Sequence, residues 1–256
     1  RRLNPNSRDI FSDLMTYEGR IAVIYFEQLS KIINGIAPEF GFDVRKNKAM
    51  SRNYNASDEV NALFNYGYAI LESEIRKSVN AVGLDGSIGF LHEITPSRTP
   101  LIYDFQELFR WIIDLSVIQL LEEKRLKKSD FIITESYHMR LRENTSKLLI
   151  EKISANFNHK VPYKGKNYYY QNVLFDNIRS FSHYISDKKK TFDFDIPKFE
   201  IQRNDTALLR EKILSMSPEE RRKLGINKST LWYLKKNVSS GKSVKIYDKM
   251  LSKLEN

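Results

Sequence analysis

The chain has 256 residues, of which 41% are hydrophobic and 12% aromatic, so it can bury a sizeable core. Its 10 glycines and 7 prolines argue against an all-β sandwich, and the absence of cysteine excludes disulfide bonds and thiolate metal sites. The sequence shows no run of 18 apolar residues and no leader-peptide pattern, so we expect a cytoplasmic protein with no membrane partner.

The formal net charge of +10 is unevenly distributed along the chain. Residues 206–256 contain 12 Lys and Arg against 5 Asp and Glu. A local surplus of this kind favours a polyanionic partner, most often nucleic acid, although it can also serve only to keep a surface soluble. On charge alone, we therefore expect nucleic acid as the partner.

The first half of the chain has the periodicity of long amphipathic helices. Apolar residues recur at three- and four-residue spacing over 15–33, and an Asn-Gly pair is expected to end this helix. A polar loop over 43–57 follows. A second helix opens at Asp58, and Pro100 begins a third helix that is expected to reach about Glu123.

Helical patterns continue over about 129–156 and return in the segment NVLFDNIRSFSHYI. The later segment KTFDFDIPKFEIQRND alternates and contains Pro197, which is typical of an extended linker. The sequence thus predicts an all-α protein with two domains. A helical catalytic domain is expected over 1–200 and a small helix-turn-helix domain over 206–256.

Three acidic residues occupy unusual positions in these helices. Glu18 falls on the apolar stripe of the first helix, where an unpaired carboxylate is costly or stays protonated. It requires a cationic side chain, a hydrogen-bond network or a metal. Asp104 and Glu107 lie three residues apart among apolar neighbours, and two such carboxylates repel unless a cation lies between them. A solvated helix edge is the ordinary alternative.

His92 lies in GSIGFLH, a segment with two glycines that follows the second helix. A lone histidine is more often a hydrogen-bonded structural residue than a ligand. An imidazole on a glycine bend, together with Glu18 and the carboxylate pair, makes a mixed nitrogen and oxygen donor set. Such a set suits Mg²⁺ or Mn²⁺, with Zn²⁺ also possible, although no spacing rule makes it specific.

Further polar residues are candidates for contacts with DNA. Asn61, Asn65 and Tyr68 form a polar stripe on the second helix, which either contacts backbone phosphates or holds helices together. Arg98 and Arg110 are candidate phosphate-binding residues, with simple salt bridges as the alternative.

The segment MSPEERRKLGINKSTLWYLKKN has the features of a helix-turn-helix. Ser217 and Glu220 form a capping box, Leu-Gly-Ile predicts a tight turn, and a second helix begins at Asn227 or Ser229. Recognition helices contact base edges with polar residues near their N-terminus and phosphates with lysines. An ordinary helical hairpin is the alternative. The candidate DNA-binding residues are Lys228, Ser229, Thr230, Tyr233, Lys235 and Lys236.

Four segments, LMTYEGRIAVIYF, NALFNYGYAILESEI, GLDGSIGFLH and TPLIYDFQELFR, occur in this order within about residues 10–150. Together they resemble the catalytic domain of the spacer-acquisition integrase family of CRISPR systems. The resemblance implies an α-helical, metal-dependent DNA integrase. It also implies metal-ligand roles for Glu18, His92 and Glu107, with Asp104 just beside the metal. That family normally has a β-rich dimerisation domain before the first segment, whereas 17 residues precede Glu18 here.

The C-terminal module distinguishes two branches of this family. CRISPR integrases usually lack a helix-turn-helix there, whereas casposases, their transposon-encoded relatives, often carry one. The combination resembles a casposase. It implies an enzyme that joins the 3′-OH ends of a mobile element with terminal inverted repeats to target DNA by transesterification, as a homo-oligomer, a dimer or tetramer on DNA. The alternatives are a spacer-acquisition integrase acting with a small partner protein, a non-catalytic DNA-binding regulator, and a nuclease that cuts without joining.

Overall fold

The computed structural model describes residues 10–43, 45, 56–92, 99–135, 138–197 and 212–239. The chain divides into two compact units between Pro197 and Lys198, and each unit has a core of its own. Across the described segments, no helix is long and apolar enough to cross a membrane.

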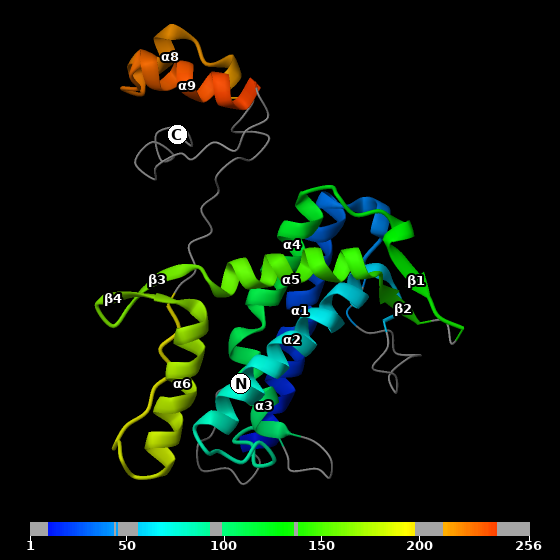
Figure 1. Ribbon diagram of the computed structural model, residues 1–256, viewed down its shortest axis with the longest axis vertical. Helices are drawn as coiled ribbons and strands as arrows, with labels where there is room; N and C mark the ends of the chain where they lie inside the picture. The colour runs from blue at the N-terminus through cyan, green and yellow to red at the C-terminus, as the bar shows by residue number, and fades with distance from the viewer. Residues whose placement is uncertain are drawn as a thin grey trace. The chain divides into compact units, whose positions relative to one another are not determined.

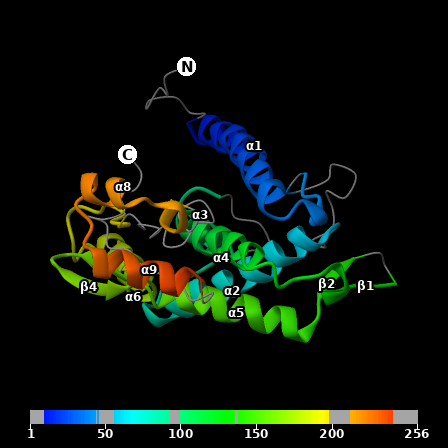
Figure 2. The ribbon, with the colours of Figure 1, turned by 90° about the horizontal axis from the view of Figure 1, so that it is seen from above.

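Four helices form the centre of the larger unit. They are α2 (Glu59–Ala81), α3 (Pro100–Phe109), α4 (Trp111–Glu122) and α5 (Glu143–Phe157). Helix α2 packs against the other three, and α4 also packs against α5 (Figures 1 and 2). Apolar side chains from all four helices are buried between them, among them Leu63, Phe64, Leu71, Phe105, Ile112 and Ile153.

Helix α1 (Ile10–Ile36) is attached to this centre mainly through its C-terminal part. Its buried side chains are Leu29 and Ile33, whereas Ile21 is 66% exposed. The expected helix is therefore confirmed, but its apolar stripe is covered only near one end. Helix α1 runs in the same direction as α3 and α4, and Figure 2 shows its N-terminal half diverging from them.

The second helix is confirmed in detail, and the third differs from expectation. The side chain of Asp58 caps α2 by accepting a hydrogen bond from the Asn61 N–H, 2.8 Å away. The third helix is divided into α3 and α4 at Arg110, which keeps right-handed helical angles. The polar loop expected over 43–57 lies mostly outside the described residues.

The all-α prediction is wrong in detail because two short hairpins are present. Strand β1 (Phe131–Ile133) pairs with β2 (Met139–Leu141), and β3 (Lys160–Tyr163) pairs with β4 (Lys166–Tyr169), both antiparallel. The helical pattern expected from residue 129 therefore begins only with α5. β-Branched isoleucines favour a strand in the first hairpin. In the β3–β4 hairpin, the turn residues Lys164 and Gly165 both have a left-handed φ, and such a turn matches the twist of the strands.

Helix α6 (Tyr170–Ile185) confirms the helical prediction for that segment. Residues 191–197 have no regular structure, but they belong to the larger unit, so the expected linker does not begin here. Asn177 on α6 holds this stretch by donating to the Asp195 carbonyl at 2.8 Å and accepting from its N–H at 2.9 Å. Residues 198–206, the rest of the expected linker, lie outside the described part.

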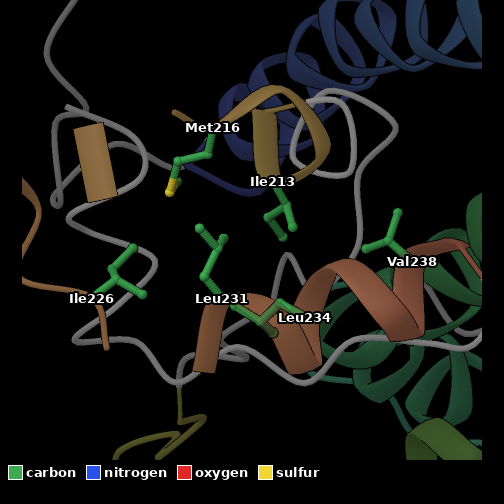
Figure 3. Close-up of a cluster of buried hydrophobic side chains, with 6 residues drawn as sticks. All are labelled: Ile213, Met216, Ile226, Leu231, Leu234 and Val238. Atoms are coloured by element: carbon green, nitrogen blue, oxygen red, sulfur yellow. The ribbon is translucent and has the colours of Figure 1, made fainter. Parts of the chain in front are cut away.

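The smaller unit contains α8 (Pro218–Lys223) and α9 (Lys228–Ser239), preceded by a helical turn over 212–215. The predicted capping box between Ser217 and Glu220 is present, with both hydrogen bonds formed. Gly225 between the helices has a left-handed φ of 62°. A cluster of apolar side chains joins the helices (Figure 3): Ile213, Met216, Ile226, Leu231, Leu234 and Val238.

Replacement of Gly67 by alanine tests the contact between α2 and α4. A Cβ on Gly67 would lie 2.4 Å from Ile113 Cγ2, so we expect Gly67→Ala to lower the free energy of unfolding by about 1–3 kcal/mol. Gly19→Ala on α1 is the control, because a Cβ there meets nothing within 4 Å and should add roughly 0.5–1 kcal/mol of helix stability. Denaturant unfolding measures both, and equal effects would contradict the packing.

Candidate functional site

A buried carboxylate organises the segment that carries His92. Asp104 lies on α3, and its side chain is fully buried. Its carboxylate accepts the backbone N–H groups of Phe90 at 2.6 Å, Leu91 at 3.0 Å and His92 at 3.1 Å. Because three consecutive N–H groups converge on one side chain, the bend closes around Asp104.

The same carboxylate holds the imidazole of His92. Asp104 Oδ1 lies 2.6 Å from His92 Nδ1. In the neutral imidazole, Nδ1–H donates this bond and the lone pair is on Nε2. This is the arrangement by which a carboxylate orients a metal-binding histidine. The His92 side chain is 28% exposed, so the ring is not sealed in the core.

The two glycines of the bend are not needed for a left-handed backbone. Neither Gly86 nor Gly89 has a left-handed φ. A Cβ on Gly89 would lie 2.7 Å from Asp104 Oδ2 and 2.9 Å from the His92 carbonyl oxygen. Gly89 is therefore required by the close approach of the backbone to Asp104, which the sequence did not reveal.

An aromatic cluster covers the apolar side of the bend. The ring of Phe90 lies 5.9 Å from that of Phe105, 5.5 Å from Phe181 and 5.9 Å from Phe194, measured between centroids. Phe181 lies on α6, and Phe194 lies in the stretch that follows it. The C-terminal part of the larger unit thus supports the bend, a role that sequence reasoning missed.

Glu107 lies one turn beyond Asp104 on α3 and is paired with a cation. Its Oε2 accepts a hydrogen bond from Arg110 at 2.6 Å. The Arg110 guanidinium also lies 5.2 Å from the Phe26 ring centroid and 5.1 Å from that of Tyr68. These contacts correspond to the salt-bridge interpretation of Arg110. Arg98, the other candidate for phosphate binding, lies outside the described residues.

The structure does not bring the three expected metal ligands together. Within the described segments, no group of three or more His, Asp or Glu side chains is close enough to hold a metal ion. His92 and Glu107 are both positioned by α3 and the bend it organises. Glu18 lies on the diverging half of α1 and is partly exposed, so it is not the buried carboxylate that the apolar stripe predicted.

The polar stripe of α2 makes contacts inside the unit. Arg45 donates to the side-chain oxygens of Asn61 and Asn65, both at 2.7 Å. The hydroxyl of Tyr68 donates to Asp114 on α4. These contacts support the interpretation that the stripe holds helices together. Contact with DNA at these three positions stays a prediction.

Sequence reasoning missed Asp114, which is buried on α4. It accepts the hydroxyl of Tyr25 from α1 at 2.5 Å, in addition to that of Tyr68. Burial raises the pKa of the Asp114 carboxyl, while the two hydroxyls act in the opposite direction. A signal was present, because an acid within the apolar run WIIDLSVIQLL must find partners in the core.

In the smaller unit, α9 presents most of the expected DNA-binding residues to solvent. Lys228, Ser229, Tyr233 and Lys236 are exposed, and Thr230 is partly so. Lys235 instead donates to the Met216 carbonyl at 3.0 Å. Trp232, which was not among the candidates, is 62% exposed, and the Lys236 ammonium lies 4.9 Å from its ring centroid.

Residues 4–155 match the family described as CRISPR associated protein Cas1, and the chain belongs to this family. A CRISPR-associated endonuclease Cas1 of Archaeoglobus fulgidus is 31% identical over 169 residues, covering 65% of this chain and 47% of the relative. One of Francisella tularensis subsp. novicida is 31% identical over 165 residues, covering 64% and 45%.

A solved casposase bound to an integration product is also similar. The two chains are 38% identical and superpose with a TM-score of 0.70. The match covers 75% of this chain and 55% of the casposase chain. A Cas1 protein of Thermotoga maritima, at 16% identity and a TM-score of 0.58, covers 73% of this chain and 55% of its own and shares the fold. The chain spans about half the length of the relatives it matches.

Two glycine substitutions test how the bend is built. We expect Gly89→Ala to push the backbone away from Asp104, so that the amides of Phe90, Leu91 and His92 exchange at least about tenfold faster. The His92 ring should also lose its fixed Nδ1–H tautomer, which ¹⁵N spectra of the imidazole report.

Gly86→Ala is the matched control in the same segment. A Cβ there would make ordinary contacts, the nearest 3.4 Å from Ile102 Cδ1. Exchange rates and tautomer should stay close to those of the unsubstituted protein. The same response to both substitutions would show that Gly89 is not special.

Proposed function

We propose that this chain is the catalytic and DNA-binding part of a metal-dependent DNA integrase of the casposase type. The observation that carries the proposal is the buried Asp104, which orients His92 from α3, the helix that also carries Glu107. The similarity to a casposase at 38% identity supports the same conclusion. The substrates would be the 3′-OH ends of a mobile element with terminal inverted repeats and a target duplex.

The donor types of the site fit Mg²⁺ or Mn²⁺. Glu18, His92 and Glu107 would hold the ion, which supplies polarisation of the scissile phosphate and eases activation of the 3′-hydroxyl. Asp104 keeps His92 in the tautomer whose Nε2 can bind, and Arg110 holds Glu107 in place. Because Glu18 lies on the diverging half of α1, completion of the site requires that half to approach α3.

The reaction exchanges one phosphodiester for another. The 3′-oxygen of the element end forms a bond to a target phosphorus, and the bond from that phosphorus to the target 3′-oxygen breaks. The attacking hydroxyl loses a proton and the departing oxygen gains one, so no net bond is made and no ATP is consumed. No covalent enzyme intermediate is needed.

The smaller unit would supply affinity for double-stranded DNA. The exposed residues of α9 combine lysines with hydroxyl groups and aromatic rings, as in a recognition helix of the helix-turn-helix class. Because two element ends must be joined in one event, we propose a homodimer or tetramer on DNA.

A spacer-acquisition integrase is the second candidate, since the matching relatives include CRISPR-associated Cas1 endonucleases. Such an enzyme would need a small partner protein. The two candidates differ in one measurable property, because a casposase should join DNA alone.

A strand-transfer assay tests the proposal. The full chain is incubated with a short duplex bearing a free 3′-OH, supercoiled plasmid and Mn²⁺ or Mg²⁺. We expect joined products that disappear with EDTA and fall at least about a hundredfold in His92→Ala, because an oriented metal ligand is lost. His183→Ala, an exposed histidine on α6, is the control and should join normally.

Three results of this assay would contradict the casposase proposal. Joining only after a small partner protein is added would indicate the spacer-acquisition integrase. Cleavage without joining would indicate a nuclease. Binding without either reaction would indicate a DNA-binding regulator.

Removal of two lysines of α9 tests the role of the smaller unit. We expect the double substitution Lys228→Ala and Lys236→Ala to weaken DNA binding and to make the dependence of log K on log salt shallower by about 1–2, since each lost phosphate contact removes roughly 0.9. Fluorescence anisotropy over a salt series measures this slope. Lys147→Ala, an exposed lysine of α5, should leave it unchanged.

A further inference from the structure

Helices α1, α2 and α4 meet at the buried carboxylate of Asp114. Tyr25 of α1 donates to its Oδ2 at 2.5 Å, and Tyr68 of α2 donates to its Oδ1. Asp114 is 2% exposed. Because each oxygen accepts a hydrogen bond from a different helix, loss of the carboxylate would remove one polar contact from α1 and one from α2.

A second contact beside this carboxylate connects α1 to Glu107. The ring of Phe26, next to Tyr25, lies under the Arg110 guanidinium at 5.2 Å. Arg110 in turn donates to Glu107 at 2.6 Å. The place where α1 is attached is therefore linked to one of the proposed metal ligands.

Each of the two proposed glutamate ligands precedes a partner of the Tyr25–Asp114 bond by the same number of residues. Glu18 precedes Tyr25 by seven residues, and Glu107 precedes Asp114 by seven residues. Seven residues are about two helical turns, or roughly 10 Å, and return to nearly the same face. Helix α1 runs in the same direction as α3 and α4 (Figures 1 and 2). With equal spacings, the Tyr25–Asp114 bond would place the two glutamates at about the same level along the helices.

The part of α1 before this bond is less tightly held than the part after it. Ile21 and Ile24, between Glu18 and Tyr25, are 66% and 60% exposed, whereas Leu29 and Ile33 beyond it are buried. The bond thus lies between the exposed and the buried parts of the apolar stripe of α1. A helix fixed there can approach α3 by pivoting, without sliding along it.

We propose that Asp114 is a positioning residue of the metal centre. Its bond to Tyr25 fixes the level on α1 at which Glu18 meets Glu107 and His92 when the N-terminal half of α1 approaches α3. This inference rests on the proposed integrase function for the identity of the ligands. It adds a residue that would touch neither metal nor DNA.

The test measures the position of α1 directly. The chain contains no cysteine, so spin labels can be attached specifically to Ile21→Cys on α1 and Ser73→Cys on α2, both exposed. Pulsed electron paramagnetic resonance then gives the distribution of distances between them. We expect this distribution to broaden or shift in Asp114→Asn and in Tyr25→Phe, the milder change that removes only one hydroxyl.

The second readout is the affinity for Mn²⁺, measured by titration of the unlabelled protein. We expect the half-saturating Mn²⁺ concentration to rise about tenfold in Asp114→Asn and Tyr25→Phe, in the range seen when residues supporting metal ligands are changed. The rate of joining at saturating Mn²⁺ should stay within about threefold, because the ligands themselves remain.

Asp176→Asn is the matched control. Asp176 accepts the hydroxyl of Tyr163 at 2.9 Å and pairs with Lys164 and Arg179, so it is a similar tyrosine–carboxylate site away from α1. This variant should change neither the distances nor the Mn²⁺ affinity.

Two outcomes would overturn the positioning role. Unchanged distances in both Asp114→Asn and Tyr25→Phe would show that Asp114 does not hold α1. Changed distances with unchanged Mn²⁺ affinity would show a purely structural role. Unsubstituted protein that binds no Mn²⁺ would instead disprove the proposed metal centre, so the two failures are distinguishable.

Discussion

The hydrogen bonds to Asp104 are the interaction on which the candidate site depends. A buried carboxylate is costly unless polar groups surround it, and here three backbone N–H groups and an imidazole do so. These bonds constrain the backbone of the bend, because all four donors must reach the same carboxylate. The direction of the His92 ring follows from these bonds, and the need for glycine at position 89 follows as well.

Two buried acids on the consecutive helices α3 and α4 have different structural roles in the larger unit. Asp104 on α3 shapes the bend and orients an imidazole, whereas Asp114 on α4 joins three helices through tyrosine hydroxyls. Glu107 and Arg110 lie between them in the sequence and are hydrogen-bonded to each other. Helices α3 and α4 thus position both the His92 bend, through Asp104, and α1, through Asp114.

Local signals allowed much of the fold to be predicted from the sequence. The cap of α2, the extent of α6 and the capping box of α8 depend on residues a few positions apart, and all three are confirmed. Features that depend on distant partners were missed. The tyrosine that binds Asp114 from α1 lies 89 positions earlier, and a short apolar run such as Phe131–Ile133 fits helix or strand equally well.

The aromatic support of the His92 bend also bears on the order in which the protein folds. Phe90 contacts Phe181 and Phe194, which lie 91 and 104 positions later in the chain. The bonds to Asp104 can form as soon as α3 has left the ribosome, but their hydrophobic cover cannot. Contacts so far apart in sequence form late, since a long loop must close first. A growing chain therefore completes this part of a proposed DNA-joining site only after residue 194 has been synthesised.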